Sequence, residues 1–277
     1  MRSVLRRVVP RSARNWLRSP GQAMRWLSND LRGPVNLALR RDWTFRCPRN
    51  AAERAFHLQV QDPPQVREFD DFVEYAKSAG RIVLLDIGCH FGVFCFAALH
   101  YGGAGSRALG VDPSSEAQGM VDRIAKLNGW SDRVAFRQAA AGAEDGFLEM
   151  VETGLTGAGY VVLPQDHPQA DRRRLPMMTV DRLAEAMGEP PTLVKVDVES
   201  FELDVLRGGR RTFAERGTPL FLEIHNRMMR ERNVDPALVI RQLRADGYRS
   251  FRIAGRELGD EELLGGDIVR VLVRRTA

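Results

Sequence analysis

The feature that most constrains the fold of this chain is the alternation of short apolar runs with segments of helical periodicity. Five runs have the length and composition of buried strands: RIVLLDIG (81–88), SRALGVDP (106–113), RVAFRQAA (133–140), TLVKVDV (192–198) and PLFLEIH (219–225). Strands that alternate with helices predict an α/β fold, in which a mostly parallel sheet is covered by helices on both faces. Two late segments, YRSFRIA and DIVRVLVRR, are expected to add an antiparallel pair.

The expected helices have apolar side chains three or four residues apart, together with end signals such as a serine or aspartate cap and a closing glycine. They cover residues 64–79, about 93–101, 113–129, 180–188, 200–217 and 235–247. Residues 141–191 are less regular, and there we expect loops and one strand at RLPMMTV. The division that follows is a basic extension over 1–50, a helical lead-in over 51–80 and one main domain over 81–277.

The fourth strand carries an unusual pattern. Its valines alternate with Lys195, Asp197 and Glu199, so one face is apolar and the other is charged. A central parallel strand is covered on both faces, and a buried lysine is unfavourable unless it is paired. We therefore expect Lys195 to form an ion pair with Asp197, Glu199 or Glu223, and Glu202 to be a solvated or capping residue.

The positive net charge belongs to one end of the chain. The chain has a formal charge of +5, yet residues 1–50 alone hold 12 Arg and 2 Asp. The rest of the chain is therefore net acidic, and a nucleic-acid partner is not expected for the main domain.

The N-terminal extension is rich in arginine and contains Trp16 and Trp26 without an unbroken apolar core. Such a composition is typical of a helix lying on an anionic membrane surface. It also fits a mitochondrial transit peptide, or a solvated or partner-docking extension. These alternatives stay open, with residues 1–40 as the expected region of contact.

The cysteine and hydropathy patterns exclude two classes of protein. Cys47, Cys89 and Cys95 are odd in number and show no CxxC spacing, which argues against a disulfide framework or a zinc knuckle and favours a reducing, cytoplasmic compartment. No run of about 18 apolar residues is present, so no transmembrane helix is expected.

The turn after the first strand decides between two kinds of nucleotide ligand. In DIGCHFGVF the glycines are Gly88 and Gly92, and His90 stands where a dinucleotide-binding G-x-G-x-x-G turn needs glycine. The pattern therefore disfavours NAD(P) and fits S-adenosylmethionine, which has no phosphate. Asp112 at the end of the second strand can accept hydrogen bonds from both ribose hydroxyls.

Several segments together resemble the FkbM-type methyltransferases, a class I group that depends on S-adenosylmethionine. The most specific is KVDVESFELDVLRGG, which is similar to the family pattern K-I-D-V-E-G-x-E, and the resemblance runs from about residue 81 to 253. The chain departs from the family at Cys89-His90, Asp112 and Ser200, where the family usually has Ala-Asn, Glu and Gly. The resemblance implies a Rossmann-like class I fold and O-methylation of a hydroxyl on a sugar, a lipid-linked glycan or a polyketide.

In open α/β sheets the ligand lies beyond the carboxyl ends of the strands, which assigns the candidate residues. The cofactor is expected at Asp86, Gly88, His90, Gly92, Asp112, Pro113, Ala139, Ala140 and Asp197. The catalytic candidates are His225 as general base, Glu199 as the alternative base or substrate-orienting group, and Asp197 near the ammonium of the cofactor. His225 also has a structural interpretation as a strand-end hydrogen bond, and Glu199 has one as a charge at a helix N-terminus.

No metal is expected, because methyl transfer does not require one and the ligand spacing does not demand one. The acceptor is expected to be a small molecule or a glycan. Two further hypotheses remain open: an NAD(P)-dependent oxidoreductase, and a non-catalytic domain that docks a partner enzyme or a membrane.

Overall fold

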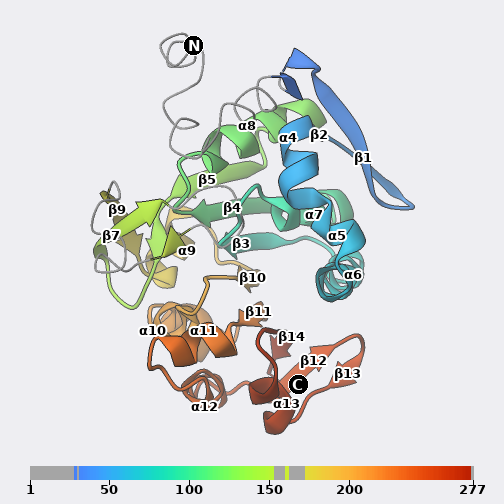
Figure 1. Ribbon diagram of the computed structural model, residues 1–277. Coiled ribbons are helices and arrows are strands. Elements are labelled where there is room, and N and C mark those ends of the chain that lie inside the picture. The colour runs from blue at the N-terminus through green and yellow to red at the C-terminus, as the bar shows by residue number, and fades with distance from the viewer. Residues whose placement is uncertain (1–27, 30, 153–159, 162–171, 276–277) are drawn as a thin grey trace.

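A computed structural model describes residues 28–29, 31–152, 160–161 and 172–275 of the chain. Its centre is a sheet of eight strands (Figure 1). In spatial order these are β13 (Arg256–Glu257), β12 (Ser250–Ile253), β14 (Val269–Arg274), β11 (Leu220–Ile224), β10 (Leu193–Val196), β3 (Val83–Ile87), β4 (Arg107–Asp112) and β5 (Val134–Gln138).

The five strands expected to be parallel are parallel to one another, β12 and β14 form the expected antiparallel pair, and β14 joins β11 in the antiparallel sense. The α/β prediction is therefore confirmed. Strand order reverses between β3 and β10, because β3 continues to β4 on one side while β10 continues to β11 on the other. Such a switch point leaves a crevice at the carboxyl ends of the two strands, which is where open α/β sheets bind ligands.

Helices cover both faces of the sheet and bury two apolar cores (Figure 1). One face is covered by α6 (Pro63–Ser78), α7 (Val93–Tyr101) and α8 (Ala117–Asn128). The other is covered by α9 (Val180–Ala186), α10 (Glu202–Arg207) and α12 (Ala237–Ala245). Shorter elements are α4 (Arg49–Ala51), the π-helical η1 (Ala52–Phe56) and η2 (Arg210–Glu215), α5 (Leu58–Gln61), α11 (Asn226–Glu231) and α13 (Asp260–Gly265).

One expected helix is divided in two. The helix expected over 200–217 ends at Arg207, and a π-helical segment follows after Gly208 and Gly209. A β-carbon at Gly208 would lie 2.1 Å from the carbonyl oxygen of Gly142, so only glycine permits this close approach. The pair of glycines therefore marks a packing contact that interrupts the helix.

The end of the presumed extension is part of the folded unit, which corrects the sequence prediction. Residues 34–48 form a hairpin of β1 (Pro34–Arg40) and β2 (Trp43–Pro48). In β2 the side chains of Trp43, Phe45 and Cys47 alternate inward and are buried in the core beside α7 and α8. The two-residue period of buried side chains in β2 was not recognised from the sequence, because arginines dominate the composition of this region. Residues 1–27 lie outside the described residues, so the proposed contact region of 1–40 is described only at its end.

The irregular region after β5 contains a second sheet. Its four strands are β6 (Ala140–Ala141), β9 (Arg172–Met178), β7 (Gly146–Glu152) and β8 (Tyr160–Val161). The strand expected at RLPMMTV is present as part of β9, whereas β7 was not expected. The expected loops at 155–159 and over most of 164–174 lie outside the described residues.

Four side chains of alternating charge join the sheet to α6, and all but Arg270 are buried. Lys195 on β10 lies 3.1 Å from both Glu68 on α6 and Glu223 on β11. Arg270 on β14 lies 3.2 Å from Glu68 and 2.7 Å from Glu223. We call these four residues the ion quartet. Lys195 is only 1% exposed, so the expected ion pair with Glu223 is confirmed and Glu68 is an additional partner.

The two carboxyl groups of the quartet differ in how readily they ionise. Burial would raise the pKa of Glu223, but Lys195 and Arg270 outweigh it and hold that pKa at about 2. Burial raises the pKa of Glu68 to about 7, and the nearby Glu223 adds to this rise.

Among the helices of the described residues, none combines the length and the apolar composition that a membrane span needs.

Replacing Lys195 with methionine should strongly destabilise the fold, because Glu68 and Glu223 would lose a shared buried cation. We expect a loss of about 3–5 kcal/mol in the free energy of unfolding, measured by urea denaturation. Lys77→Met is the matched control, since Lys77 pairs with Asp42 at the surface and should cost less than about 1 kcal/mol. Similar losses in the two variants would show that the quartet has no special role in stability.

Candidate active site

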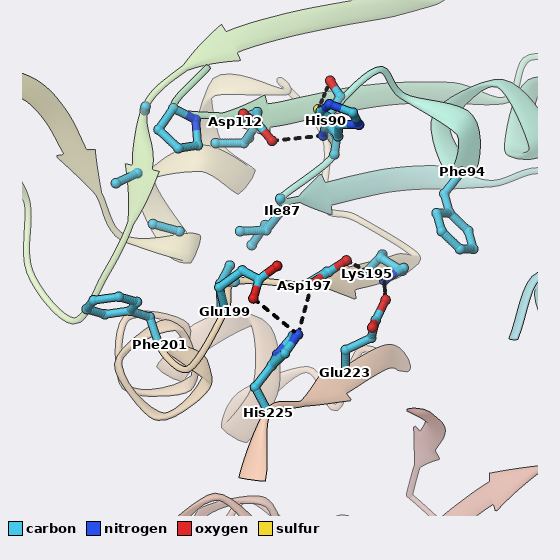
Figure 2. Close-up of a pocket in the computed structure, with 18 of the residues that line it drawn as sticks. Ile87, His90, Phe94, Asp112, Lys195, Asp197, Glu199, Phe201, Glu223 and His225 are labelled. Carbon is cyan, nitrogen blue, oxygen red and sulfur yellow. Dashed lines mark hydrogen bonds and ion pairs between the residues drawn. The ribbon is translucent and has the colours of Figure 1, made fainter. Parts of the chain in front are cut away.

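A cavity of about 620 Å³ opens at the carboxyl ends of β3, β4, β10 and β11 (Figure 2). It brings together most of the residues assigned from the sequence. Those that line it are Gly88, His90, Asp112, Pro113, Ala139, Ala140, Asp197, Glu199 and His225. In Figure 2, His90 and Asp112 lie on one side of the cavity, while Glu199 and His225 lie on the other.

Two of the assigned cofactor residues do not line the cavity, which corrects their assignment. Asp86 points to the sheet face covered by α7, where its carboxylate accepts a hydrogen bond from the Cys95 thiol at 3.3 Å. Burial raises the pKa of Asp86 to about 6. Gly92 is the N-cap of α7, where an added β-carbon would lie 3.3 Å from Phe96 and Val121. Both residues therefore contribute to the packing around the glycine turn and do not face the cavity.

Gly88 lets the first turn pass very close to the end of β10. Its φ is +82°, and a β-carbon there would lie 1.7 Å from the carbonyl oxygen of Asp197. Any side chain would force the two strand ends apart. Gly88 is thus required by the packing of the turn against Asp197, in addition to its place in the cavity wall.

Asp112 fixes the shape of the glycine turn. One carboxylate oxygen accepts a hydrogen bond from the backbone N–H of His90 at 2.8 Å, and the other accepts one from the N–H of Ser114 at 2.8 Å. Burial raises the pKa of Asp112 to about 6 despite these bonds. A carboxylate oxygen can accept more than one hydrogen bond, so both oxygens of Asp112 retain capacity for a ligand.

The N-cap residue of α8 is Glu116, so the prediction of a serine cap for this helix is wrong.

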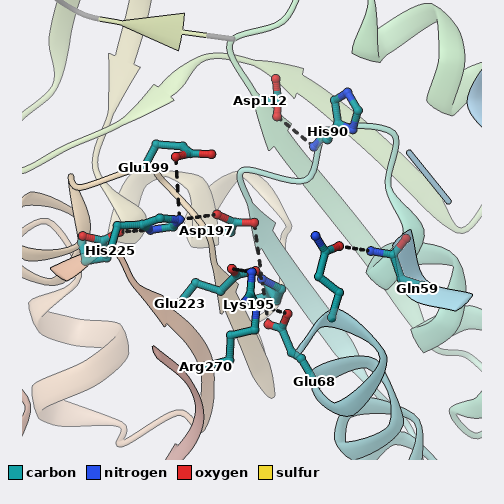
Figure 3. Close-up of polar contacts among 12 residues, drawn as sticks. Gln59, Glu68, His90, Asp112, Lys195, Asp197, Glu199, Glu223, His225 and Arg270 are labelled. Atoms are coloured by element: carbon teal, nitrogen blue, oxygen red, sulfur yellow. Dashed lines mark hydrogen bonds and ion pairs between the residues drawn. The ribbon is translucent and has the colours of Figure 1, made fainter. Parts of the chain in front are cut away.

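Asp197, Glu199 and His225 form a compact cluster at the ends of β10 and β11 (Figures 2 and 3). The Nε2 atom of His225 lies 3.7 Å from carboxylate oxygens of both Asp197 and Glu199. These carboxylates are 32% and 31% exposed, so they face the cavity. Burial, followed by the charge of Glu223, raises the pKa of Asp197 well above its usual value, and burial also raises that of Glu199.

Glu202 orients His225, which corrects the expectation that it would be solvated or a simple cap. Its side chain is fully buried at 0% exposure and lies 2.7 Å from Nδ1 of His225. It also accepts a hydrogen bond from the N–H of Ser200 at 3.0 Å. Burial alone would lower the pKa of His225, but the hydrogen bond to Glu202 and the charge of Asp197 raise it to about 9. The contacts of His225 therefore favour its protonated form in the free protein.

Arg232, which follows α11, holds the loop that carries Glu199. Glu199 and Ser200 have φ values of +50° and +86°, a backbone conformation that is strained for residues other than glycine. Arg232 donates hydrogen bonds to the Ser200 carbonyl at 2.7 Å and hydroxyl at 3.2 Å, and its guanidinium lies 3.6 Å from the ring centre of Phe201. These contacts stabilise a loop in which serine occupies a left-handed position.

The site contains one group of possible metal ligands. Asp197, Glu223 and His225 each offer a ligand atom within 4.8 Å of the others. However, Glu223 already pairs with Lys195 and Arg270, and Lys195 also lies 3.9 Å from Asp197. The positive charge that a metal would contribute is already supplied by these side chains. The group therefore fits a resident metal poorly.

Several residues of the cavity wall were not predicted from the sequence, among them Gln59, Gln65, Glu68, Phe201 and Arg270. For Glu68 a signal existed, because it lies within the apolar stripe of α6 formed by Phe69, Phe72 and Ala76. A carboxylate in a buried helical stripe calls for a partner. The two glutamines carry no comparable signal, since an uncharged amide in a short helix or at a helix start does not require a partner as a buried charge does.

A family model described as "Methyltransferase FkbM domain" matches residues 86–250, more than half of the chain. A comparison with curated proteins returned no match. The solved structures that resemble the fold include a methyltransferase FkbM from Methylobacillus flagellatus, at 15% identity and a TM-score of 0.47 over 81% of this chain and 53% of that one. A methyltransferase from Geobacter sulfurreducens has 14% identity and a TM-score of 0.47, over 82% and 88% of the two chains. The chain thus spans about half the length of the Methylobacillus protein.

Replacing Glu202 with glutamine should lower the pKa of His225, because a neutral amide cannot stabilise the imidazolium as a carboxylate does. NMR titration of the five histidines, with His225 assigned from a His225→Gln variant, would measure the change. In the wild type His225 should titrate at about 9 and its contribution to folding stability should be lost as pH rises through that value. An unchanged pKa in Glu202→Gln would show that Glu202 does not control the protonation of His225.

Proposed function

Because this chain belongs to the FkbM methyltransferase family, we propose that it methylates a hydroxyl group on a sugar, a glycolipid or a polyketide-type acceptor. The chain is an S-adenosylmethionine-dependent methyltransferase. The observation that carries the finer proposal is one cavity with a strand-end carboxylate, Asp112, on one side and a base-and-carboxylate cluster, Glu199 and His225, facing it.

The cavity offers complementary groups to each part of S-adenosylmethionine. Asp112 is fixed by two backbone N–H groups and can still accept hydrogen bonds from ribose hydroxyls. Ala139 and Ala140 provide an apolar wall for the adenine after β5. Asp197 faces the cavity with an acceptor for the ammonium group. When bound, the cofactor supplies a methyl group on a positively charged sulfur.

His225 is the proposed general base. In the transfer, the acceptor oxygen forms a bond to the methyl carbon, the carbon–sulfur bond breaks, and the hydroxyl proton passes to Nε2 of His225. Glu202 holds the imidazole by Nδ1, which leaves Nε2 directed toward Asp197 and Glu199. Pairing of either carboxylate with a cationic ligand removes part of the charge that keeps His225 protonated. Glu199 remains the alternative base.

Two proposals from the sequence concern the setting of the reaction. A cytoplasmic location is supported by the three free cysteines, all of them buried. Contact of residues 1–40 with an anionic membrane or a partner protein is supported by the arginine content of that segment.

Replacing Asp112 with alanine should weaken binding of S-adenosylmethionine by at least roughly tenfold, since hydrogen bonds to a charged group are lost. Isothermal titration calorimetry with S-adenosylmethionine and with NAD would measure both affinities, and thermal unfolding would check that the variant folds. Asp112→Asn retains one acceptor oxygen and should lose less. An alanine variant that binds as tightly as the wild type would remove Asp112 from the cofactor site.

The acceptor can be sought by mass spectrometry of glycans and lipids from cells that lack the protein. After incubation with the purified protein and S-adenosylmethionine, a component should gain about 14 daltons, the mass of one added CH₂. His225→Gln should bind the cofactor yet transfer the methyl group on the order of 100-fold more slowly, as expected on loss of a general base. Normal turnover by this variant would move the role of base to Glu199.

A further inference from the structure

The loop after β10 is a turn whose backbone does not suit its own residues. The N–H of Phe201 donates a hydrogen bond to the carbonyl oxygen of Val198 at 3.2 Å, which closes a four-residue turn. Its two central residues, Glu199 and Ser200, both have positive φ values. Positive φ at both central positions marks a type I′ turn, in which glycine, asparagine and aspartate predominate. A glutamate and a serine therefore need support from outside the turn to keep this conformation.

That support reaches Ser200 from two sides. Ser200 is only 2% exposed. Nη1 of Arg232 donates to its carbonyl oxygen at 2.7 Å and to its hydroxyl at 3.2 Å. The N–H of Ser200 donates to Oε1 of Glu202 at 3.0 Å. Every polar group of Ser200 thus has a partner, and two of the three bonds come from Arg232.

The contacts of this turn lead directly to His225. Oε1 of Glu202 also lies 2.7 Å from Nδ1 of His225, so one oxygen contacts both the Ser200 N–H and the imidazole. His225 is the N-cap residue of α11, and Arg232 is the C-cap residue of the same helix. At one end of α11, Nε2 of His225 contacts Glu199 at 3.7 Å (Figure 2). At the other end, Arg232 holds the next residue of the turn.

We propose that Arg232 is a positioning residue that holds Glu199 at His225 by fixing the conformation of Ser200. The inference rests on the proposed function, because Glu199 and His225 are the pair proposed to receive the acceptor hydroxyl. In this arrangement α11 is a bracket with a contact to the turn at each end. Serine is accepted at a left-handed position because Arg232 binds its carbonyl and its hydroxyl together. Without these bonds the turn would relax and Glu199 would move away from His225.

The test separates the hydrogen bonds of Arg232 from its charge. The carboxylates of Asp204 and Glu202 counteract the effect of burial on the pKa of Arg232, so the charge itself must be kept. Arg232→Lys keeps the charge and loses the planar fork of donors. The amide hydrogen of Ser200 should then exchange with solvent on the order of 10- to 100-fold faster, the value of hydrogen bonds from a charged group. Hydrogen exchange followed by NMR measures both rates.

The titration of His225 shows whether a loosened turn affects the site. Glu199 is one of the carboxylates that raise the pKa of His225, so Glu199→Gln should lower that pKa. Arg232→Lys should lower it as well, because a released turn carries the carboxylate away from the imidazole. If Arg232 only stabilised the fold, Arg232→Lys would lower the unfolding temperature and leave the pKa of His225 unchanged. NMR titration measures the pKa in each variant.

Ser200→Gly provides a rescue. Glycine adopts positive φ without steric cost, so the turn should keep its conformation without the fork of Arg232. Adding Arg232→Lys to Ser200→Gly should change the exchange rate of the amide at position 200 by no more than about threefold. The pKa of His225 should stay at the wild-type value. Ser200→Ala keeps the strain and should not rescue. Arg227→Lys, at a 64% exposed arginine of α11, is the matched control and should change neither measurement.

Three results would overturn the proposal. Equal effects of Arg232→Lys with serine and with glycine at position 200 would show that Arg232 does not compensate for the serine. An unchanged pKa of His225 in Arg232→Lys, or in Glu199→Gln, would show that the turn does not hold Glu199 at His225. These measurements need no acceptor, so absence of methyl transfer would contradict the proposed function alone. Thermal unfolding of each variant separates these results from loss of fold.

Discussion

The ion quartet joins three strands of the central sheet to α6. Lys195 and Glu223 stand on adjacent central strands, so their charges are enclosed between the sheet and α6. Charges taken out of water are tolerated only when each has partners of opposite sign. Glu68 and Arg270 supply them, and this requirement fixes where α6 and β14 lie. The cavity at the strand ends adjoins this group, and Glu68, Lys195, Glu223 and Arg270 form part of its wall.

The same group sets the electrostatics of the site. Glu223 keeps its negative charge because Lys195 and Arg270 flank it, and that charge raises the pKa of neighbouring Asp197. Asp197 and Glu199 in turn favour a protonated His225. The pKa values of all three groups, Asp197, Glu199 and His225, are therefore raised in the free protein. A cationic ligand fits such a cluster, since it can replace protons as the source of positive charge.

The order of strands and helices could be predicted from the sequence because it depends on local periodicity. The apolar runs, the helical stripes of α6, α8 and α12 and the wholly apolar α7 are visible without knowledge of their partners. The pairing of Lys195 was also predictable, since a lysine on a central strand needs a counter-charge. Glu68 and Glu202 were missed or misjudged because their partners are 127 and 23 positions away, and only the fold brings them together. The hairpin of β1 and β2 was missed because its arginines dominated the composition.

The four residues of the quartet are spread along the chain, which limits how the protein can be divided and how it can change in evolution. Lys195 and Glu223 lie within the segment that matches the family model, whereas Glu68 and Arg270 lie outside it on opposite flanks. The recognisable domain is therefore not a self-sufficient module. Its central pair, Lys195 and Glu223, gains a second partner from each flanking segment, so grafting the matched segment alone would leave these two residues paired only with each other and remove Glu68 and Arg270. Substitutions at positions 68 and 270 should accordingly be accepted together, as compensating changes, more readily than one at a time.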